Sequence, residues 1–167
     1  LEFLRGVVYN SIYGSLEENI ESGYGQSYGV EFYLRKKSGK STGWLSYTLS
    51  RTEQKFDAIN SGLIYPAKYD RRHEVSLVFI RKFSEKWSGS AVYIYISGNA
   101  FTMPLGRYVI QGNIVNQYGD VNSFRMPSYH RMDMAMTRKI VTGKNWSSVL
   151  TFSVYNIYNR ANPYFIY

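Results

Sequence analysis

The chain has 167 residues, of which 17 are tyrosine, 9 phenylalanine and 3 tryptophan while 19% are charged, a composition that is unusual for a soluble domain of this length. The absence of cysteine excludes disulfides and thiolate metal sites, and no apolar run reaches the roughly 18 residues that a transmembrane helix needs. A net charge of +8 fits nucleic acid, an anionic membrane surface or an anionic substrate, so the placement of the charges has to decide among these partners.

Apolar and polar residues alternate along the first half of the chain, which predicts β-strands. A weak strand covers residues 3–13. A clear one begins at Tyr28, because every second residue over 28–34 is apolar or aromatic while Glu31 and Arg35 share the other parity. The same alternation predicts further strands at residues 44–51, 71–83 and 87–97.

The second half of the chain predicts two more strands, at residues 129–140 and 146–158. In the first of these, Met134 and its neighbours two residues away are methionines, and they alternate with Arg131 and Asp133. About seven strands result, none of which contains a proline. Each is long enough to cross a bilayer, since about 9–11 tilted residues span the hydrocarbon core.

Short turns and long loops alternate between these strands. The long loops, rich in Gly, Asn, Ser and Tyr, cover residues 11–27, 52–70 and 98–128, and the short turns cover residues 36–43, 84–86 and 142–145. Lysine and arginine gather beside the short turns, which favours one edge of a membrane over a nucleic-acid groove; a solvated hairpin end in a soluble protein remains the alternative. This order is typical of a transmembrane β-barrel with short periplasmic turns and long external loops.

The three tryptophans, Trp44, Trp87 and Trp146, each stand at the start of a predicted strand just after a short turn. An aromatic girdle on the periplasmic side of a barrel would lie there. Only Trp146 shares parity with the apolar face that the alternation predicts for its strand, so bulges or inward-pointing rings are needed for the other two. Plain packing at hairpin ends is the alternative.

Several blocks of the sequence resemble the carboxy-terminal barrel region of TonB-dependent outer-membrane receptors, especially those of Bacteroidetes-type bacteria. In order and spacing these blocks cover most of the chain. They are GQSYGVE at 25–31, GWLSYTLS at 43–50, YDRRH at 69–73, SGNAFTMP at 97–104, PSYHRMD at 127–133, and YNIYNR at 155–160 followed by Asn162 and Pro163. The blocks are typical of the family and not of one substrate.

The resemblance implies an all-β, antiparallel transmembrane β-barrel of 22 strands in the outer membrane of a Gram-negative bacterium, with residues 1–167 supplying about seven of the strands. It also implies that the whole protein binds and imports a nutrient, of which siderophore, cobalamin, glycan and peptide all stay open. A TonB-type energy-transducing partner would act through a plug domain, outer-membrane lipid and lipopolysaccharide would surround the wall, and a surface lipoprotein is a further possible partner. The sequence contains no plug, no TonB-contacting box and no signal peptide, so we expect an internal piece of a longer chain.

Candidate site residues follow from the two sides of such a wall. Charged residues that alternate with lipid-facing ones have to face the lumen, because an arginine on the lipid face near mid-membrane costs about 2–4 kcal/mol. We expect Arg131 to pair with Asp133 or with a plug residue, and the lumen-facing polar set is Glu31, Arg35, Arg131 and Asp133. The candidates for ligand contact are aromatic residues of the predicted outer loops: Tyr65, Phe101, Tyr108 and Tyr118.

Enzymatic chemistry finds no support in the sequence. The two histidines, His73 and His130, stand beside arginines at no metal-ligand spacing, and no nucleophile elbow, paired-carboxylate motif or phosphate-binding loop is present. We therefore expect no catalytic residue, no metal, no cofactor and no nucleic-acid partner. The alternative function is a soluble, secreted β-sandwich that binds carbohydrate through exposed aromatic rings.

Overall fold

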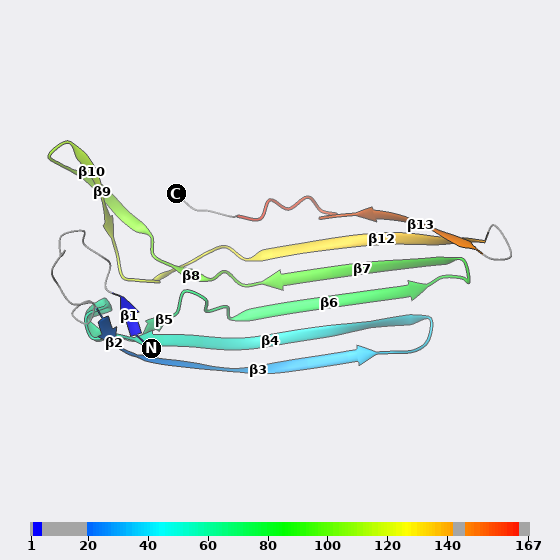
Figure 1. Cartoon of the computed structure of the whole chain (residues 1–167), viewed down its shortest axis with the longest axis horizontal. Coiled ribbons are helices and arrows are strands. Elements are labelled where there is room, and N and C mark those ends of the chain that lie inside the picture. The colour runs from blue at the N-terminus through cyan, green and yellow to red at the C-terminus, as the bar shows by residue number, and fades with distance from the viewer. Residues whose placement is uncertain (1, 5–19, 142–145, 164–167) are drawn as a thin grey trace. The chain divides into compact units, whose positions relative to one another are not determined.

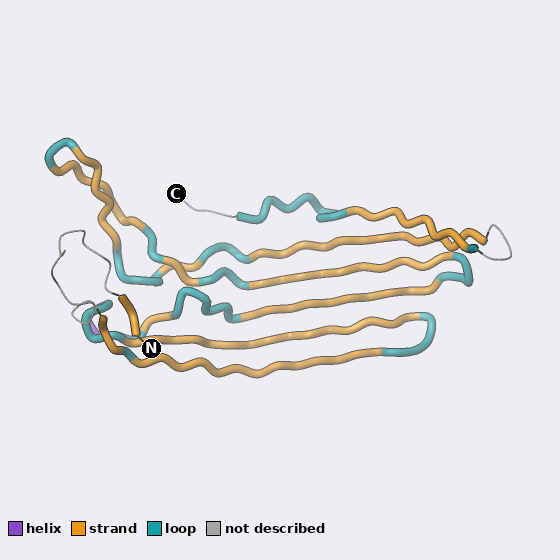
Figure 2. Tube along the Cα trace, in the orientation of Figure 1, coloured by secondary structure: helices purple, strands orange, loops and turns teal. Residues whose placement is uncertain are grey.

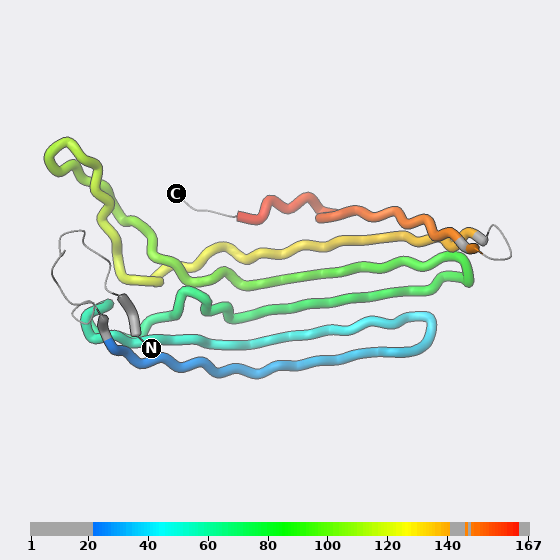
Figure 3. Tube along the Cα trace, in the orientation of Figure 1, coloured from blue at the N-terminus to red at the C-terminus, as the bar shows by residue number. Residues whose placement is uncertain are grey.

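The computed structural model describes residues 2–4, 20–141 and 146–163 (Figure 2). Contacts between residues divide the chain into two compact units. Unit 1 comprises Leu1–Tyr28, Arg51–Asp70 and Asn99–Arg125, and unit 2 comprises Gly29–Ser50, Arg71–Gly98 and Met126–Tyr167. Each unit is therefore assembled from three separate stretches of sequence (Figure 3). The part of the chain that the structure describes holds no helix with the length and apolar character needed to cross a membrane.

Unit 2 is built on one open sheet of long strands (Figure 1). Each long strand lies next to its neighbour in the chain, in the order β3-β4-β6-β7-β12-β13. The first residues of β3 and the last of β4 belong to unit 1, where the short β5 (Tyr65–Pro66) pairs with β4. The long strands are β3 (Tyr24–Lys36), β4 (Ser41–Lys55), β6 (His73–Lys82), β7 (Trp87–Ile96), β12 (Tyr129–Val141) and β13 (Ser147–Val154).

This sheet confirms the all-β class and the six strands predicted from clear alternation. The weaker strand predicted at residues 3–13 is described only at its start, where β1 (Glu2–Leu4) pairs with β2 (Ile20–Ser22) in a separate sheet of unit 1. Within the described residues the long sheet ends at β3 and β13 and does not close on itself, so a closed barrel is not observed.

Local chemistry explains the two short turns that the structure describes. Between β3 and β4, Gly39 adopts φ +97°, a conformation that glycine tolerates without steric cost. Between β6 and β7, the Ser84 hydroxyl oxygen accepts hydrogen bonds from the backbone N–H groups of Lys86 (3.3 Å) and Trp87 (3.1 Å). The third predicted turn, residues 142–145, lies outside the described residues.

Unit 1 gives the predicted long loops more structure than the sequence indicated. The stretch predicted as a loop at 98–128 contains the pair β8 (Ala100–Phe101) and β11 (Phe124–Arg125), and between them a hairpin of β9 (Pro104–Ile110) and β10 (Asn113–Tyr118). The hairpin turns at Gln111 and Gly112, whose φ angles of +50° and +83° suit a two-residue turn with both central residues left-handed. A short 3₁₀ turn, η2 (Asn60–Gly62), lies in the 52–70 stretch.

Burial differs sharply between the two units. Among the described residues, the buried apolar side chains are Phe56, Tyr65, Ala67 and Ala100, and all four belong to unit 1. In unit 2, by contrast, Phe152 is 76% exposed and Val30 69% exposed although both sit on long, regular strands. Unit 2 is thus a single layer of sheet without a core of its own.

Candidate functional site: a two-faced sheet and a folded loop unit

One face of the unit 2 sheet is apolar from strand to strand. The register aligns Phe79 on β6 with Ala91 on β7, Ala91 with Met134 on β12, and Met134 with Val154 on β13. Because successive side chains of a strand point to opposite faces, the residues two positions away extend the same surface. They include Leu45, Leu77, Tyr93, Met132, Met136, Leu150 and Phe152.

The opposite face is lined mainly by hydroxyl and charged side chains. Thr137 and Thr151 form a cross-strand hydrogen bond of 3.2 Å on this face. The rings of Tyr33 and Trp44 lie 6.2 Å apart, which places the odd-numbered residues of β3 on the same face as the even-numbered residues of β4. Two predicted lumen-facing residues of β3, Glu31 and Arg35, therefore share a face with the following serines and threonines: Ser46, Thr48, Ser76, Ser88, Ser90 and Ser153.

The prediction for Trp87 at the start of β7 was wrong. The alternation of this strand suggested that Trp87 lies off the apolar face, but the unbroken pairing with β12 puts Trp87 on the same side as Ala91 and Tyr93. Both parities of β7 are apolar, with tyrosines on one and aliphatic residues on the other, so the sequence of this strand alone does not identify the outer face. The aliphatic side chains, Val92 and Ile94 among them, extend from the otherwise polar face.

Arg131 and Asp133 form an ion pair on the polar face, as predicted. Their closest charged atoms are 3.0 Å apart, and both side chains are largely shielded from solvent, at 20% and 25% exposed. The Arg131 guanidinium also lies 4.1 Å from the centre of the Tyr155 ring, and the second carboxylate oxygen of Asp133 accepts a hydrogen bond of 2.9 Å from the backbone N–H of Asn156. The pair thus fixes the end of β13 against β12. Each of the two carboxylate oxygens of Asp133 therefore has a partner within the sheet and the residues that follow β13.

Aromatic and histidine side chains form a belt across the apolar face where the long connections leave the strands. Tyr47 shares a hydrogen bond of 2.9 Å with the Nδ1 atom of His73, and Tyr158 shares one of 2.8 Å with the Nδ1 atom of His130. His130 also lies against Tyr95, at 6.3 Å between ring centres. Desolvation raises the pKa of the Tyr158 phenol above its ordinary value, which favours the protonated hydroxyl in this contact.

A second belt crosses the same face at the short-turn end. Trp87 is 41% exposed and Phe83 57% exposed, and the guanidinium of Arg138 lies 5.2 Å from the centre of the Trp87 ring. Trp146, whose side chain is 64% exposed, stands just before β13. Trp44 differs, since it pairs in register with Val78 and therefore lies on the polar face. The two belts thus bracket the apolar surface along the strands.

The four aromatic candidates for ligand contact all belong to unit 1 but differ in exposure. Tyr65 is only 4% exposed, so its ring is part of the small core of that unit and is not offered to a ligand. Phe101 is half-buried and packs against Phe124 at 6.2 Å between ring centres. Tyr108 on β9 and Tyr118 on β10 are exposed, at 46% and 59%. Of the four candidates, the two tyrosines of the β9–β10 hairpin are therefore the ones whose rings are exposed at the surface and accessible to a ligand.

Sequence analysis missed a polar network that ties the loops of unit 1 together. Asp70, at 1% exposed, forms an ion pair with Arg125 and accepts a hydrogen bond from the backbone N–H of Thr52. The side chain of Asn60 forms two hydrogen bonds with the backbone of Val121, at 2.7 and 2.9 Å. These contacts join the 52–70 stretch to the 99–125 stretch, and a separation of about 55 residues leaves no local pattern that could reveal them.

The described residues contain no cluster of three or more histidine, aspartate or glutamate side chains that could hold a metal ion. Both histidines are instead hydrogen-bonded to tyrosines in the belt.

We compared the chain with protein-family models, with curated protein sequences and with solved structures. No protein-family model, no curated protein sequence and no solved structure matches the chain.

Proposed function

We propose that this chain forms part of the wall of an outer-membrane transporter of the TonB-dependent receptor type, which binds a nutrient and passes it through a lumen. The main support for a membrane-spanning wall is the unit 2 sheet, because it is a single layer with one apolar face and one polar face. The receptor type rests on the sequence blocks around residues 25–31, 43–50 and 127–133.

An apolar face without a covering layer needs an apolar surrounding. Large side chains on this face are exposed on the outermost strand, where Leu150 and Phe152 are 59% and 76% exposed. Exposed apolar surface of this extent is rare in soluble monomers and marks an interaction surface or a membrane. A sandwich, the alternative function, would bury this face against a second sheet, whereas in unit 2 the face is open.

The spacing of the two belts matches a bilayer. On β12 the belts are represented by His130 and Arg138, which are separated by eight steps along the strand. At about 3.4 Å per residue this distance is about 27 Å, or about 20 Å across the membrane at a tilt of about 40°, close to the apolar band of about 25 Å in outer-membrane barrels. Amphipathic rings at both edges of such a band would lie at the headgroup level.

The polar face then lines the lumen, and the loops of unit 1 offer a capture surface. Serine and threonine hydroxyls, with the Arg131–Asp133 pair, give a wet interior that suits passage of a polar solute. Tyr108 and Tyr118 on the β9–β10 hairpin supply exposed rings for ligand contact. In this proposal a plug and a TonB-type partner supply the energy for transport, and the sheet performs no bond chemistry.

Carbonate extraction of membranes tests the proposal. The protein that carries this sequence should remain in the outer-membrane pellet at alkaline pH and should need detergent to become monodisperse, because its apolar face requires hydrocarbon. A soluble sandwich would be released into the supernatant and would run as a single species in plain buffer. Release into the supernatant would end the proposal.

A further inference from the structure

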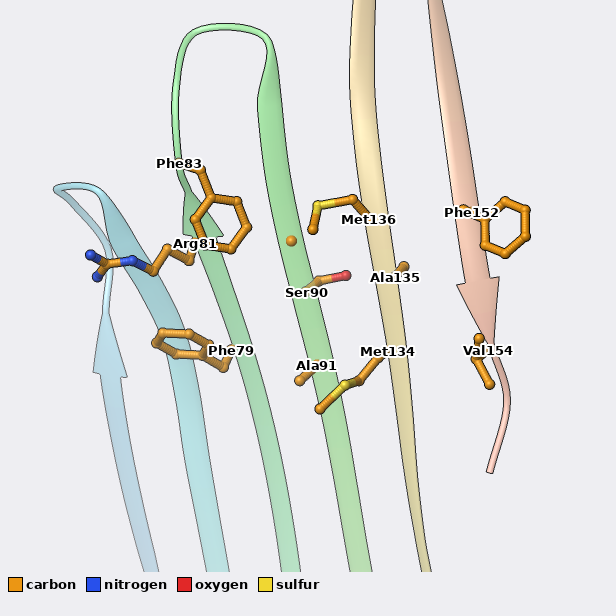
Figure 4. A pocket seen from close by; sticks show the side chains of 11 residues that line it. Phe79, Arg81, Phe83, Ser90, Ala91, Met134, Ala135, Met136, Phe152 and Val154 are labelled. Atoms are coloured by element: carbon orange, nitrogen blue, oxygen red, sulfur yellow. The ribbon is translucent and has the colours of Figure 1, made fainter. Parts of the chain in front are cut away.

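A hollow on the apolar face of unit 2 lies along β7 (Figure 4). It has a volume of about 440 Å³, and nearly all of its lining is apolar. The small residues Gly89 and Ala91 lie beneath it on β7, while bulky side chains on β6, on the turn that follows β6, and on β12 and β13 form its walls. The wall residues are Phe79, Phe83, Met134, Met136, Phe152 and Val154.

The Phe83 ring lies directly over Gly89 at the short-turn end of the hollow. A Cβ atom on Gly89 would come within 2.9 Å of the Phe83 ring, closer than real side chains pack. Glycine is thus the residue that lets the Phe83 ring lie this close to β7, where the ring forms one end of the hollow. A trough of this shape along a strand fits a linear apolar chain better than a flat protein surface.

Two arginines flank the short-turn end of this hollow. In the described parts of β6, β7, β12 and β13, the apolar face carries two side chains with a fixed charge, Arg81 and Arg138. Arg81 lines the hollow and pairs in register with Gly89, and its Nη1 atom donates a hydrogen bond of 2.8 Å to the Ser41 hydroxyl. Arg138 pairs in register with Trp87, on the other side of β7.

The two arginines indicate that a ligand in the hollow carries a negative charge. Their strands lie on either side of β7, about 10 Å apart, and the two residues are offset by two positions along the sheet. The Arg81 guanidinium is bonded to Ser41 on the β4 side and that of Arg138 lies over the Trp87 ring, so both side chains have to turn toward the space over β7 to hold one phosphate. No carboxylate lies on this face in the described parts of the four strands, so a second copy of the chain packed on it would leave both charges unpaired. An anion with an apolar tail fits both features, because the tail packs in the apolar hollow and the anionic group pairs with the two arginines.

We propose that this hollow binds an acyl chain of an anionic phospholipid, whose phosphate is held by Arg81 and Arg138. The site rests on the membrane wall proposed above and adds to it one specific lipid, seated in the leaflet on the short-turn side. Arginine suits this role because its planar guanidinium binds phosphate through two parallel hydrogen bonds.

Native mass spectrometry of the protein purified in detergent tests the site. The probe is an equimolar mixture of phosphatidylglycerol and phosphatidylcholine with identical acyl chains, which differ only in headgroup charge. We expect the wild-type protein to retain phosphatidylglycerol over phosphatidylcholine by about tenfold, as two basic residues at a membrane surface allow. In the double variant Arg81→Gln/Arg138→Gln the two lipids should be retained equally.

A matched control separates the site from general positive charge. Lys82→Gln/Lys139→Gln removes the same two charges from the neighbouring positions on the opposite face, and should keep the wild-type preference. Ala91→Leu raises the floor of the trough, and should lower retention of both lipids while leaving their ratio higher than in the arginine variant.

Three results would overturn the lipid site. They are equal retention of the two lipids by the wild type, an unchanged preference in Arg81→Gln/Arg138→Gln, and a detergent-stable dimer that Ala91→Leu dissociates. Each of these in a protein that resists carbonate extraction contradicts the lipid site and leaves the wall intact. Release by carbonate contradicts the wall, and the lipid site with it.

Discussion

Met134→Arg should abolish assembly of the protein in the membrane. Met134 lies on the apolar face midway between the two aromatic belts, with Ala91 and Val154 as its cross-strand neighbours. In the proposed membrane wall, an arginine at that depth on the lipid side costs about 2–4 kcal/mol, which is a large part of the stability of an ordinary fold. The measurement is the fraction of protein that remains folded in the outer-membrane pellet, followed by its shifted mobility on unheated gels.

Thr137→Arg is the matched control for this change. Thr137 lies three residues further along β12 on the opposite face, where it bonds Thr151 across the strands. The new guanidinium would face the wet side and should lower the assembled fraction only slightly. Equal losses in the two variants would contradict the assignment of faces.

Arg125→Ala should unfold the loop network of unit 1 and leave the long sheet in place. Removal of the guanidinium strands the Asp70 carboxylate, which is 1% exposed, without its charged partner. Breaking a buried pair in this way costs about 3 kcal/mol, the lower end of the usual range because the Arg125 side chain is 34% exposed. Hydrogen exchange should rise across residues 99–125 and stay unchanged in β6 and β12.

Arg107→Ala provides the comparison within the same unit. Arg107 lies on β9 and is exposed, so loss of its charge should leave exchange in residues 99–125 unchanged. If Arg125→Ala behaved like Arg107→Ala, the Asp70–Arg125 pair would not be what holds the two loop stretches together.

The long strands could be predicted from the sequence because one physical requirement repeats along them. A strand with one apolar and one polar face must alternate with a period of two, and residues such as Met134 and Thr137 obey that rule without reference to any distant residue. The Arg131–Asp133 pair was also predictable, since residues two apart on a strand lie on the same face.

Strand β7 shows where this rule stops. Tyr93 and Ile94 stand on opposite faces, yet both are apolar enough to face hydrocarbon, so parity alone does not orient the strand. Tyr93 pairs with Met132 on β12 and with Leu77 on β6, and this register places Tyr93 on the apolar face. The outward position of Trp87 follows from that register and not from its own neighbours in sequence.

The loop unit was the least predictable part of the fold. The β9–β10 hairpin left one local trace, Gln111-Gly112 between two alternating stretches, which resembles the Asn-Gly signature of a tight turn. The burial of Tyr65 and the Asp70–Arg125 pair left none, because both depend on contacts between stretches that are far apart in the chain. A loop rich in Gly, Asn and Tyr can equally be open or folded on itself.

A nitroxide scan along β12 measures which of its residues face hydrocarbon and which face water, and the absence of cysteine from the 167 residues makes single labelling sites simple to introduce. Residues 132–137 would be replaced one at a time by a spin-labelled cysteine in the membrane-embedded protein. In the proposed wall, collisions with oxygen, which concentrates in hydrocarbon, should peak at 132, 134 and 136, while collisions with a water-soluble nickel complex should peak at 133, 135 and 137. Uniform accessibility along the strand, or oxygen maxima at the odd-numbered positions, would contradict the proposed wall.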